Sequence, residues 1–161
     1  MTNVKKRLKG LIDSKSVVVI GLGNPDRADD GVGIEVAKKL KELAPDRIFL
    51  EQDGLEGVVL DILNRKDAET VLFIDAVDFD GRAGEIQIFS QATFQFRRIS
   101  THKVSLELLS ALLRKEGKAI YLLGIQPSTL DFDSKISDEV KKSLEKVVEI
   151  FTPFFNHSER G

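Results

Sequence analysis

The chain has 161 residues, of which 42% are hydrophobic and 31% are charged, and its formal net charge is -2. A chain of this size can bury one sizeable core, so we expect a single domain over residues 1–161. It contains no cysteine, which excludes disulfides, iron–sulfur clusters, zinc–thiolate sites and thiol catalysis. Its slight acidity argues against nucleic acid as a partner, because phosphate binding needs a clustered basic face.

The N-terminal residues 1–15 are basic but lead into no apolar stretch, and no segment approaches the roughly 20 apolar residues of a membrane span. We therefore expect a cytoplasmic protein with no membrane contact. We also expect it to act as a monomer. The arm 1–15 and the polar tail 156–161 are predicted to be peripheral to the domain. His157 lies in that tail and is set aside as a site residue.

Two strand–helix units open the chain. The β-branched run 16–21 is typical of a strand buried on both faces of a parallel sheet. Apolar residues at helical spacing predict an amphipathic helix over 32–40, which ends before Pro45. The pattern then repeats with a short strand at 48–50 and a helix over 55–62.

A third strand is predicted at 71–74. The turn residues 80–84 lead into the strictly alternating segment 85–89, which predicts a hairpin with the third strand and hence one antiparallel strand. Leucines at helical spacing over 106–113 predict the next helix.

The pattern ends with a strand at 120–123 and a helix over 136–151 that Ser137 is expected to cap. Strands and helices thus alternate along the whole chain. Right-handed crossovers place such helices on both faces of the sheet. The sequence therefore predicts an α/β fold, a three-layer α/β/α sandwich with a mixed, mostly parallel sheet of about five strands.

Acidic residues follow two of the predicted strands, where ligands of open α/β sheets bind. Asp29 and Asp30 lie at the start of the helix after the first strand, and Asp75 directly follows the third strand. We expect Asp75 and at least one of the two adjacent carboxylates to face a shared crevice.

Each of these carboxylates also has a structural interpretation. Asp29 is placed to cap the following helix, and Asp75 to form an Asx turn after its strand. Asp30 has no further capping role to fill, although its charge suits the positive end of the helix dipole.

His102 precedes the helix over 106–113. A lone histidine is a weak signal, but two carboxylates and one imidazole suit a borderline divalent ion such as nickel or zinc. Because Asp30, Asp75 and His102 are far apart along the chain, the set depends on the fold bringing them together.

Several short blocks follow one another along the chain: Gly21-Leu22-Gly23-Asn24, Asp29-Asp30-Gly31-Val32-Gly33, Asp53-Gly54, Ile74-Asp75-Ala76, Gly84-Glu85-Ile86, Ser100-Thr101-His102 and Leu123-Gly124-Ile125-Gln126-Pro127. In order and spacing this combination resembles the hydrogenase maturation endopeptidases, which process the large subunit of nickel–iron hydrogenases. The resemblance extends from Val17 to Phe151.

The resemblance implies that Asp30, Asp75 and His102 are metal ligands and that the two aspartates are catalytic. It also implies an endopeptidase that removes a C-terminal extension from the nickel-loaded precursor of the large subunit. Nickel is then presented by the substrate, and other divalent ions can substitute. Leu55 stands where the family more often has a second glycine after Asp-Gly, so Asp53 is a secondary candidate.

Two mechanisms stay open for such an enzyme. A water bound to the ion could attack the scissile carbonyl, since a divalent cation lowers the pKa of water and polarises carbonyl oxygens. Alternatively, the carboxylate pair of Asp30 and Asp75 could act as acid and base without metal.

Other families share single features with this chain. Gly21 to Pro25 also resembles the start of peptidyl-tRNA hydrolases, but the histidine-containing continuation of that family and a basic charge are missing. A magnesium-dependent phospho-receiver signalling domain would use Asp29, Asp30 and Asp75, yet it needs a lysine after the fifth strand, where Gln126 stands. A dinucleotide-binding module needs a third glycine after Gly23 that the chain lacks.

Overall fold

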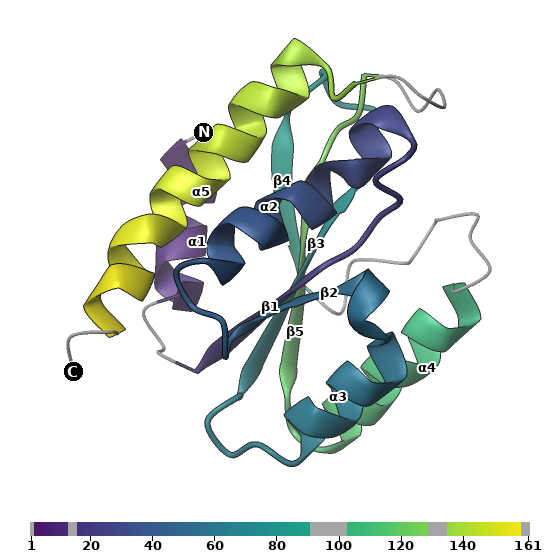
Figure 1. The fold of residues 1–161 in the computed structure, drawn as a ribbon, viewed down its shortest axis with the longest axis vertical. Helices are drawn as coiled ribbons and strands as arrows, with labels where there is room; N and C mark the ends of the chain where they lie inside the picture. Colours follow the sequence, from purple (N-terminus) through teal and green to yellow (C-terminus); the bar gives the residue numbers. More distant parts are fainter. Residues whose placement is uncertain (1, 13–15, 91–102, 129–134, 159–161) are drawn as a thin grey trace.

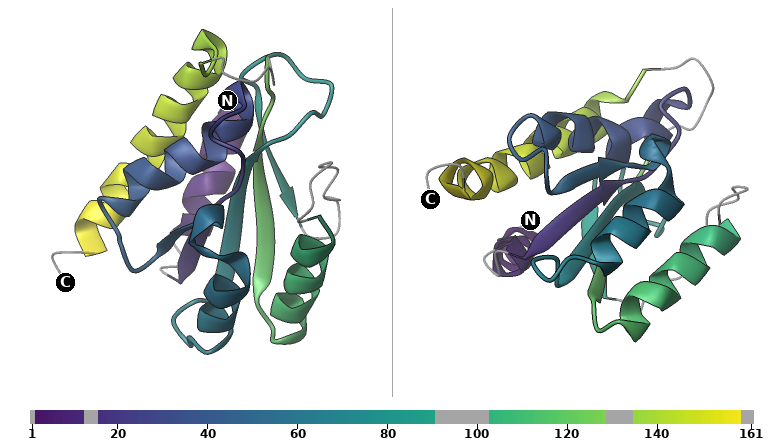
Figure 2. Two further views of the ribbon diagram at one scale, coloured as in Figure 1. Left: turned by 45° about the vertical axis from the view of Figure 1, so that its right-hand side comes forward. Right: turned by 60° about the horizontal axis from the view of Figure 1, so that its bottom comes forward.

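The structure of the protein is a computed structural model, and it describes residues 2–12, 16–90, 103–128 and 135–158. Five strands form one sheet in the order β2-β1-β3-β5-β4, with helices on both faces (Figures 1 and 2). The strands are Val17–Gly21 (β1), Ile48–Leu50 (β2), Thr70–Ala76 (β3), Ile86–Ser90 (β4) and Ala119–Ile125 (β5). The predicted three-layer α/β/α fold is confirmed.

The helices divide into two layers. The α-helices are Thr2–Ile12 (α1), Val32–Lys41 (α2), Leu55–Leu63 (α3), Lys103–Lys115 (α4) and Asp138–Ser158 (α5), and two short 3₁₀ helices are Ala28–Gly31 (η1) and Glu51–Asp53 (η2). Figure 2 shows α1, α2 and α5 on one side of the sheet and α3 and α4 on the other.

Strand β1 lies inside the sheet, between β2 and β3, and its side chains are apolar on both faces. Val17 and Val19 belong to the core beneath α1, α2 and α5, whereas Val18 and Ile20 belong to the core beneath α3 and α4. Burying each such side chain stabilises the fold by about 1.5–3 kcal/mol. β1 pairs in parallel with both β2 and β3, as its continuous apolar run predicts.

The predicted hairpin between β3 and β4 is wrong. β4 is antiparallel, as its alternation predicts, but it pairs with β5, which lies between β3 and β4. The connection 77–85 passes over the carboxyl end of β5: Val77 N donates to Ile125 O (3.0 Å), and Gln126 N donates to Glu85 O (2.8 Å). A partner that comes later in the chain leaves no mark on the local pattern of β4.

The N-terminal arm is also less peripheral than its charge suggests. Val4, Leu8 and Ile12 recur at four-residue spacing in α1, and Leu8 and Ile12 are buried in the core. Arg7 Nη1 donates to Ile88 O of β4 (2.9 Å). The lysines of this helix are exposed and its apolar residues face the core, so the helix is amphipathic. The arm thus forms part of one helix layer of the fold.

At the other end of the chain, α5 continues into the predicted tail, and residues 159–161 lie outside the described structure. The rings of Phe151 and Phe155 stack with their centroids 5.5 Å apart and anchor this helix on the core. Among the helices that the structure describes, none is both long and apolar enough to cross a membrane.

Candidate functional site at the carboxyl edge of the sheet

The carboxyl ends of β1 and β3 lie side by side. Gly21 pairs in register with Ile74, and Leu22 N donates to Ile74 O (2.8 Å). The loop after β1 therefore begins beside Asp75, the sixth residue of β3.

The loop after β1 and the start of η1 contain two residues with positive φ, Gly23 and Ala28. Gly23 has a φ of 139°, and a Cβ there would collide with Asp30 O. Ala28, which is buried, has a φ of 46°, a conformation that non-glycine residues seldom adopt. The turn that follows is closed by Asp30 N donating to Arg27 O (2.9 Å), and it carries Asp29 and Asp30.

Two glycines allow the segment after this turn to pack closely against the strand ends. A Cβ on Gly33 would collide with Ile74 O and Leu22 O, and one on Gly21 would collide with Gly33 O. Cα atoms of η1 and β3 approach within 8 Å of each other. The fold thus brings the turn that carries Asp30 next to the strand that carries Asp75.

Both candidate carboxylates accept hydrogen bonds from the main chain. Asp30 is half-buried, and its Oδ2 accepts from Asn24 N (3.2 Å). Asp75 is 2% exposed, and its Oδ1 accepts from Ala76 N (2.8 Å). The alternative of an Asx turn at Asp75 would use the N–H of Val77, which instead donates to β5. A buried carboxylate is retained only where such donors offset its lost hydration.

Asp29 does not cap the helix that follows it, so that prediction is wrong. No side-chain cap bond is present at the start of η1 or α2. Asp29 is fully buried, and it accepts from Ser128 N (2.7 Å), Ser137 N (2.7 Å) and Ser137 Oγ (2.9 Å). The carboxylate thus faces the connection between β5 and α5. Ser137 does occupy the position before α5, with its carbonyl accepting from Lys141 N (2.8 Å).

Asp53, the secondary candidate, has a local structural role. Its Oδ2 accepts from Leu50 N (3.0 Å) and lies 3.4 Å from Lys41 Nζ at the surface. Gly54, with a φ of 92°, directly precedes α3. Leu55 is buried in the core beneath α3 and α4, which explains a leucine in place of a second glycine.

Two further polar residues at this edge were not predicted. Glu51 directly follows β2, and its Oε1 accepts from Gly23 N (3.2 Å). Gln126 directly follows β5 and is 7% exposed. The rule that points to Asp75, a polar residue at the end of a strand, would have found both.

Gln126 organises the connection 77–85. Its Oε1 accepts from Phe79 N (2.9 Å) and Gly81 N (3.0 Å), and its Nε2 donates to Asp78 Oδ1 (3.0 Å). The bond from the Gln126 amide lowers the pKa of Asp78, with help from the backbone N–H of Asp80.

His102 lies outside the described residues, so the structure does not place it. Within the described part of the chain, no three His, Cys, Asp or Glu side chains are grouped closely enough to hold a metal ion. Asp30 and Asp75 offer oxygen ligands of the kind that borderline divalent ions accept, and a third ligand would have to come from elsewhere.

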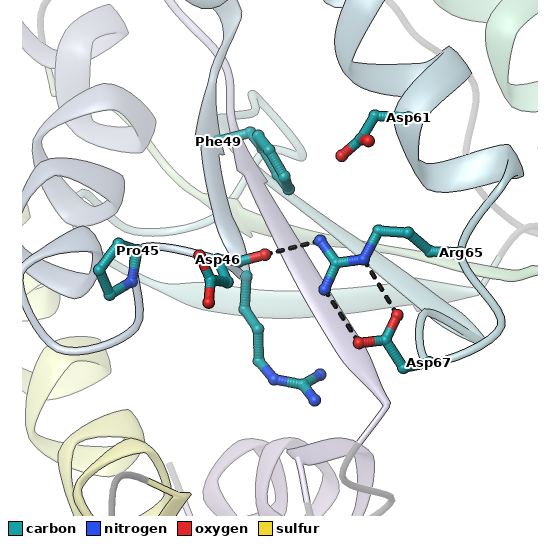
Figure 3. Close-up of a pocket in the computed structure, with 7 residues that line it drawn as sticks. Pro45, Asp46, Phe49, Asp61, Arg65 and Asp67 are labelled. Carbon is teal, nitrogen blue, oxygen red and sulfur yellow. Dashed lines mark hydrogen bonds and ion pairs between the residues drawn. The ribbon is translucent and has the colours of Figure 1, made fainter.

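A cavity of about 500 Å³ lies at the opposite, amino edge of the sheet (Figure 3). The Arg65 guanidinium donates to Asp67 through Nε (3.0 Å) and Nη2 (3.2 Å), and its Nη1 donates to Asp46 O (2.6 Å). The bond to Asp67 raises the pKa of Arg65, and the bond from Arg65 lowers the pKa of Asp67. These groups fasten the connection before β3 to the one before β2.

The family described as hydrogenase maturation protease matches residues 34–153. A predicted hydrogenase maturation protease of Methanocaldococcus jannaschii is 35% identical over 151 residues, covering 88% of this chain and 89% of that protein. The hydrogenase 3 maturation protease of Escherichia coli is 28% identical, covering 81% of this chain and 85% of that protein.

Solved structures agree with these matches. The crystal structure of a [NiFe] hydrogenase maturation protease from Thermococcus kodakarensis superposes with a TM-score of 0.74 at 27% identity, covering 92% of this chain and 97% of that one. A second [NiFe] hydrogenase maturation protease of the same organism gives a TM-score of 0.62 at 28% identity, covering 83% and 95%.

Proposed function

Because the chain belongs to the hydrogenase maturation protease family, we propose that it removes a C-terminal extension from the nickel-loaded precursor of a nickel–iron hydrogenase large subunit. Family membership makes the chain a peptidase of hydrogenase maturation. The substrate, its metal and the residues that meet it are the further steps of the proposal.

The observation that carries the proposal is the packing of η1 on the end of β3. It gives two carboxylates, Asp30 and Asp75, from segments more than 40 residues apart in sequence, one shared edge of the sheet. In the proposed site they bind the nickel ion of the substrate, and His102 adds a nitrogen ligand. Recognition then depends on the metal that the precursor has already received.

The proposed chemistry assigns separate tasks to the ion and the protein. A divalent ion lowers the pKa of a bound water and polarises a nearby carbonyl oxygen. Cleavage also needs a group that takes the proton of the attacking water and gives it to the departing amide nitrogen. Asp30 and Asp75 are the candidates for this proton transfer. A carboxylate that accepts main-chain N–H bonds is held in a fixed orientation for it.

The other families considered from the sequence gain no support. A receiver domain requires a lysine after the fifth strand, and the side chain that follows β5 is Gln126, bonded to the connection 77–85. The family match and the relatives reported above are maturation proteases and include no peptidyl-tRNA hydrolase.

The direct test is to incubate the protein with nickel-loaded and nickel-free precursor of a hydrogenase large subunit and to follow the mass of the precursor. We expect the loaded form to lose its C-terminal extension and the nickel-free form to stay intact. Equal cleavage of both forms would overturn recognition through the metal while leaving the peptidase assignment in place. Precursor loaded with another divalent ion, such as zinc, is expected to be cut as well.

A further inference from the structure

We propose that Asp29 is a positioning residue that fastens η1 to the β5–α5 connection and so fixes the orientation of Asp30. This inference rests on the proposed role of Asp30 in the site. Asp29 is the member of the acidic pair that bonds the β5–α5 connection.

The hydrogen bonds of Asp29 lie in the interior of the protein and not at its surface. The side chain is fully buried, and its two oxygens accept from Ser128 N, Ser137 N and Ser137 Oγ at 2.7–2.9 Å. Hydrogen bonds to an ionised acceptor at such distances are about twice as strong as neutral ones. The donors lie at the two ends of one connection, so a single carboxylate holds both ends.

The position of Asp29 in η1 passes this restraint to its neighbour. Asp29 and Asp30 share a peptide bond inside a turn of four residues, Ala28–Gly31. The turn leaves little freedom, because the Asp30 N–H is bonded to Arg27 O and the carbonyl of Asp30 accepts from Asn24 N (3.2 Å). A rotation of the Asp29 backbone would therefore turn the Asp30 side chain as well and break its bond from Asn24 N.

The strain at Ala28 supports the same conclusion. A non-glycine residue at a φ of 46° is less stable than one in the ordinary regions, and it persists only where the surroundings impose it. Asp29 comes immediately after this residue, and its three bonds to the β5–α5 connection supply such a constraint.

A series of variants removes the hydrogen bonds of Asp29 to different extents. Asp29→Ala removes the acceptor altogether. Asp29→Asn keeps the shape but offers one oxygen in place of two, so at least one of the two main-chain donors is left facing an amide NH₂ group. Ser137→Ala removes only the hydroxyl bond, and Ser137→Thr restores a hydroxyl.

The matched control is Ser143→Ala in α5, the helix that Ser137 directly precedes. Ser143 is buried like Asp29, and its hydroxyl donates to Gly84 O rather than to η1. The control therefore removes a buried serine hydroxyl from α5 without touching the acidic turn.

The experiment measures kcat and KM for nickel-loaded precursor at a temperature at which every variant is folded, together with amide hydrogen exchange of η1. We expect kcat to fall about 10–100-fold in Asp29→Asn, as for partners that orient metal ligands. Asp29→Ala should fall at least as far and Ser137→Ala less. Ser137→Thr and Ser143→Ala should match the parent, and exchange at Asp30 should rise in the order of the losses in kcat.

Other outcomes would contradict either this inference or the proposed role of Asp30. A folded Asp29→Asn with the kcat of the parent would overturn the inference and leave Asp29 a purely structural residue. If Asp29→Asn fails to fold, the comparison of Ser137→Ala with Ser143→Ala takes its place, and equal kcat in these two would overturn the inference. Full activity in Asp30→Ala would instead overturn the proposed role of Asp30 itself.

Discussion

At the carboxyl edge of the sheet, Asp30 and Asp75 accept hydrogen bonds from main-chain N–H groups, whereas at the amino edge Asp67 accepts a forked pair of bonds from the Arg65 guanidinium. The backbone donors bring no formal charge of their own, while the guanidinium neutralises the carboxylate that it holds. The first arrangement holds each carboxylate in one orientation, and the second joins the connection before β3 to the one before β2. Acidity alone therefore does not identify a site, because Asp67 is acidic and yet serves to join two connections.

The largest expected effect is at Asp75. Asp75→Asn keeps an oxygen that can accept from Ala76 N, so the fold should survive, but it removes the charge and the proton-accepting group. We expect processing of nickel-loaded precursor to fall by about 10²-fold or more, with a melting temperature near that of the parent. The assay is the mass of the precursor over time.

The control for this comparison is Asp61→Asn at the amino edge, an exposed aspartate that lines the cavity of Figure 3. It should process precursor at the rate of the parent. Similar losses in Asp61→Asn and Asp75→Asn would remove the distinction between the two edges.

A second effect concerns the packing of the carboxyl edge. Gly33→Ala would push a Cβ into Ile74 O and Leu22 O, which are backbone atoms that cannot move aside. We expect the free energy of unfolding to fall by about 3 kcal/mol, as in severe overpacking, and processing to fall with it because η1 shifts. Urea denaturation measures the loss, and a variant as stable as the parent would contradict the close packing described above.

The matched glycine on the other face of the sheet should respond in the opposite direction. Gly57 is exposed within α3, and a Cβ there would meet no atom within 4 Å. Gly57→Ala should raise the free energy of unfolding by about 0.5–1 kcal/mol, because alanine is the better helix former. Destabilisation in the same urea experiment would show that α3 has less room than its surroundings suggest.

The smallest effect is expected from the pair of Arg65 and Asp67. The Asp67 side chain is 60% exposed, so solvent screens the pair, and a double-mutant cycle with Arg65→Ala and Asp67→Ala should give a coupling of about 0.5 kcal/mol. Because the bond from Arg65 lowers the pKa of Asp67, the coupling should be complete above the ordinary value of 3.8 and be lost as the pH falls through the lowered one. A coupling that grows towards low pH would contradict this sign.

Much of the fold follows from local patterns. The apolar run that forms β1 and the helical spacing in α2 predict the parallel core, because both patterns are set by which faces the element buries. The partner of β4 could not be predicted, because β5, which lies between β3 and β4, comes later in the chain than both. The arm before β1 reads as peripheral in the sequence because lysines surround its buried residues, Leu8 and Ile12.

The candidate site is predictable to the extent that it depends on strand ends. Asp75 is marked by its place after an apolar run, and Glu51 and Gln126 fit the same rule. The role of Asp29 was not predictable, because its donors Ser128 and Ser137 come 99 and 108 residues later in the chain. A carboxylate before a helix has the same local pattern whether it caps that helix or holds a distant segment.

Whether Asp30, Asp75 and His102 share one ion can be seen by anomalous diffraction at the nickel edge from crystals of the protein soaked in a nickel salt. We expect one ion bound by these three residues, with ligand distances of about 2.0–2.2 Å, as for comparable divalent ions. A strong peak that touches neither Asp30 nor Asp75, or two separate ions on these residues, would contradict the proposed site.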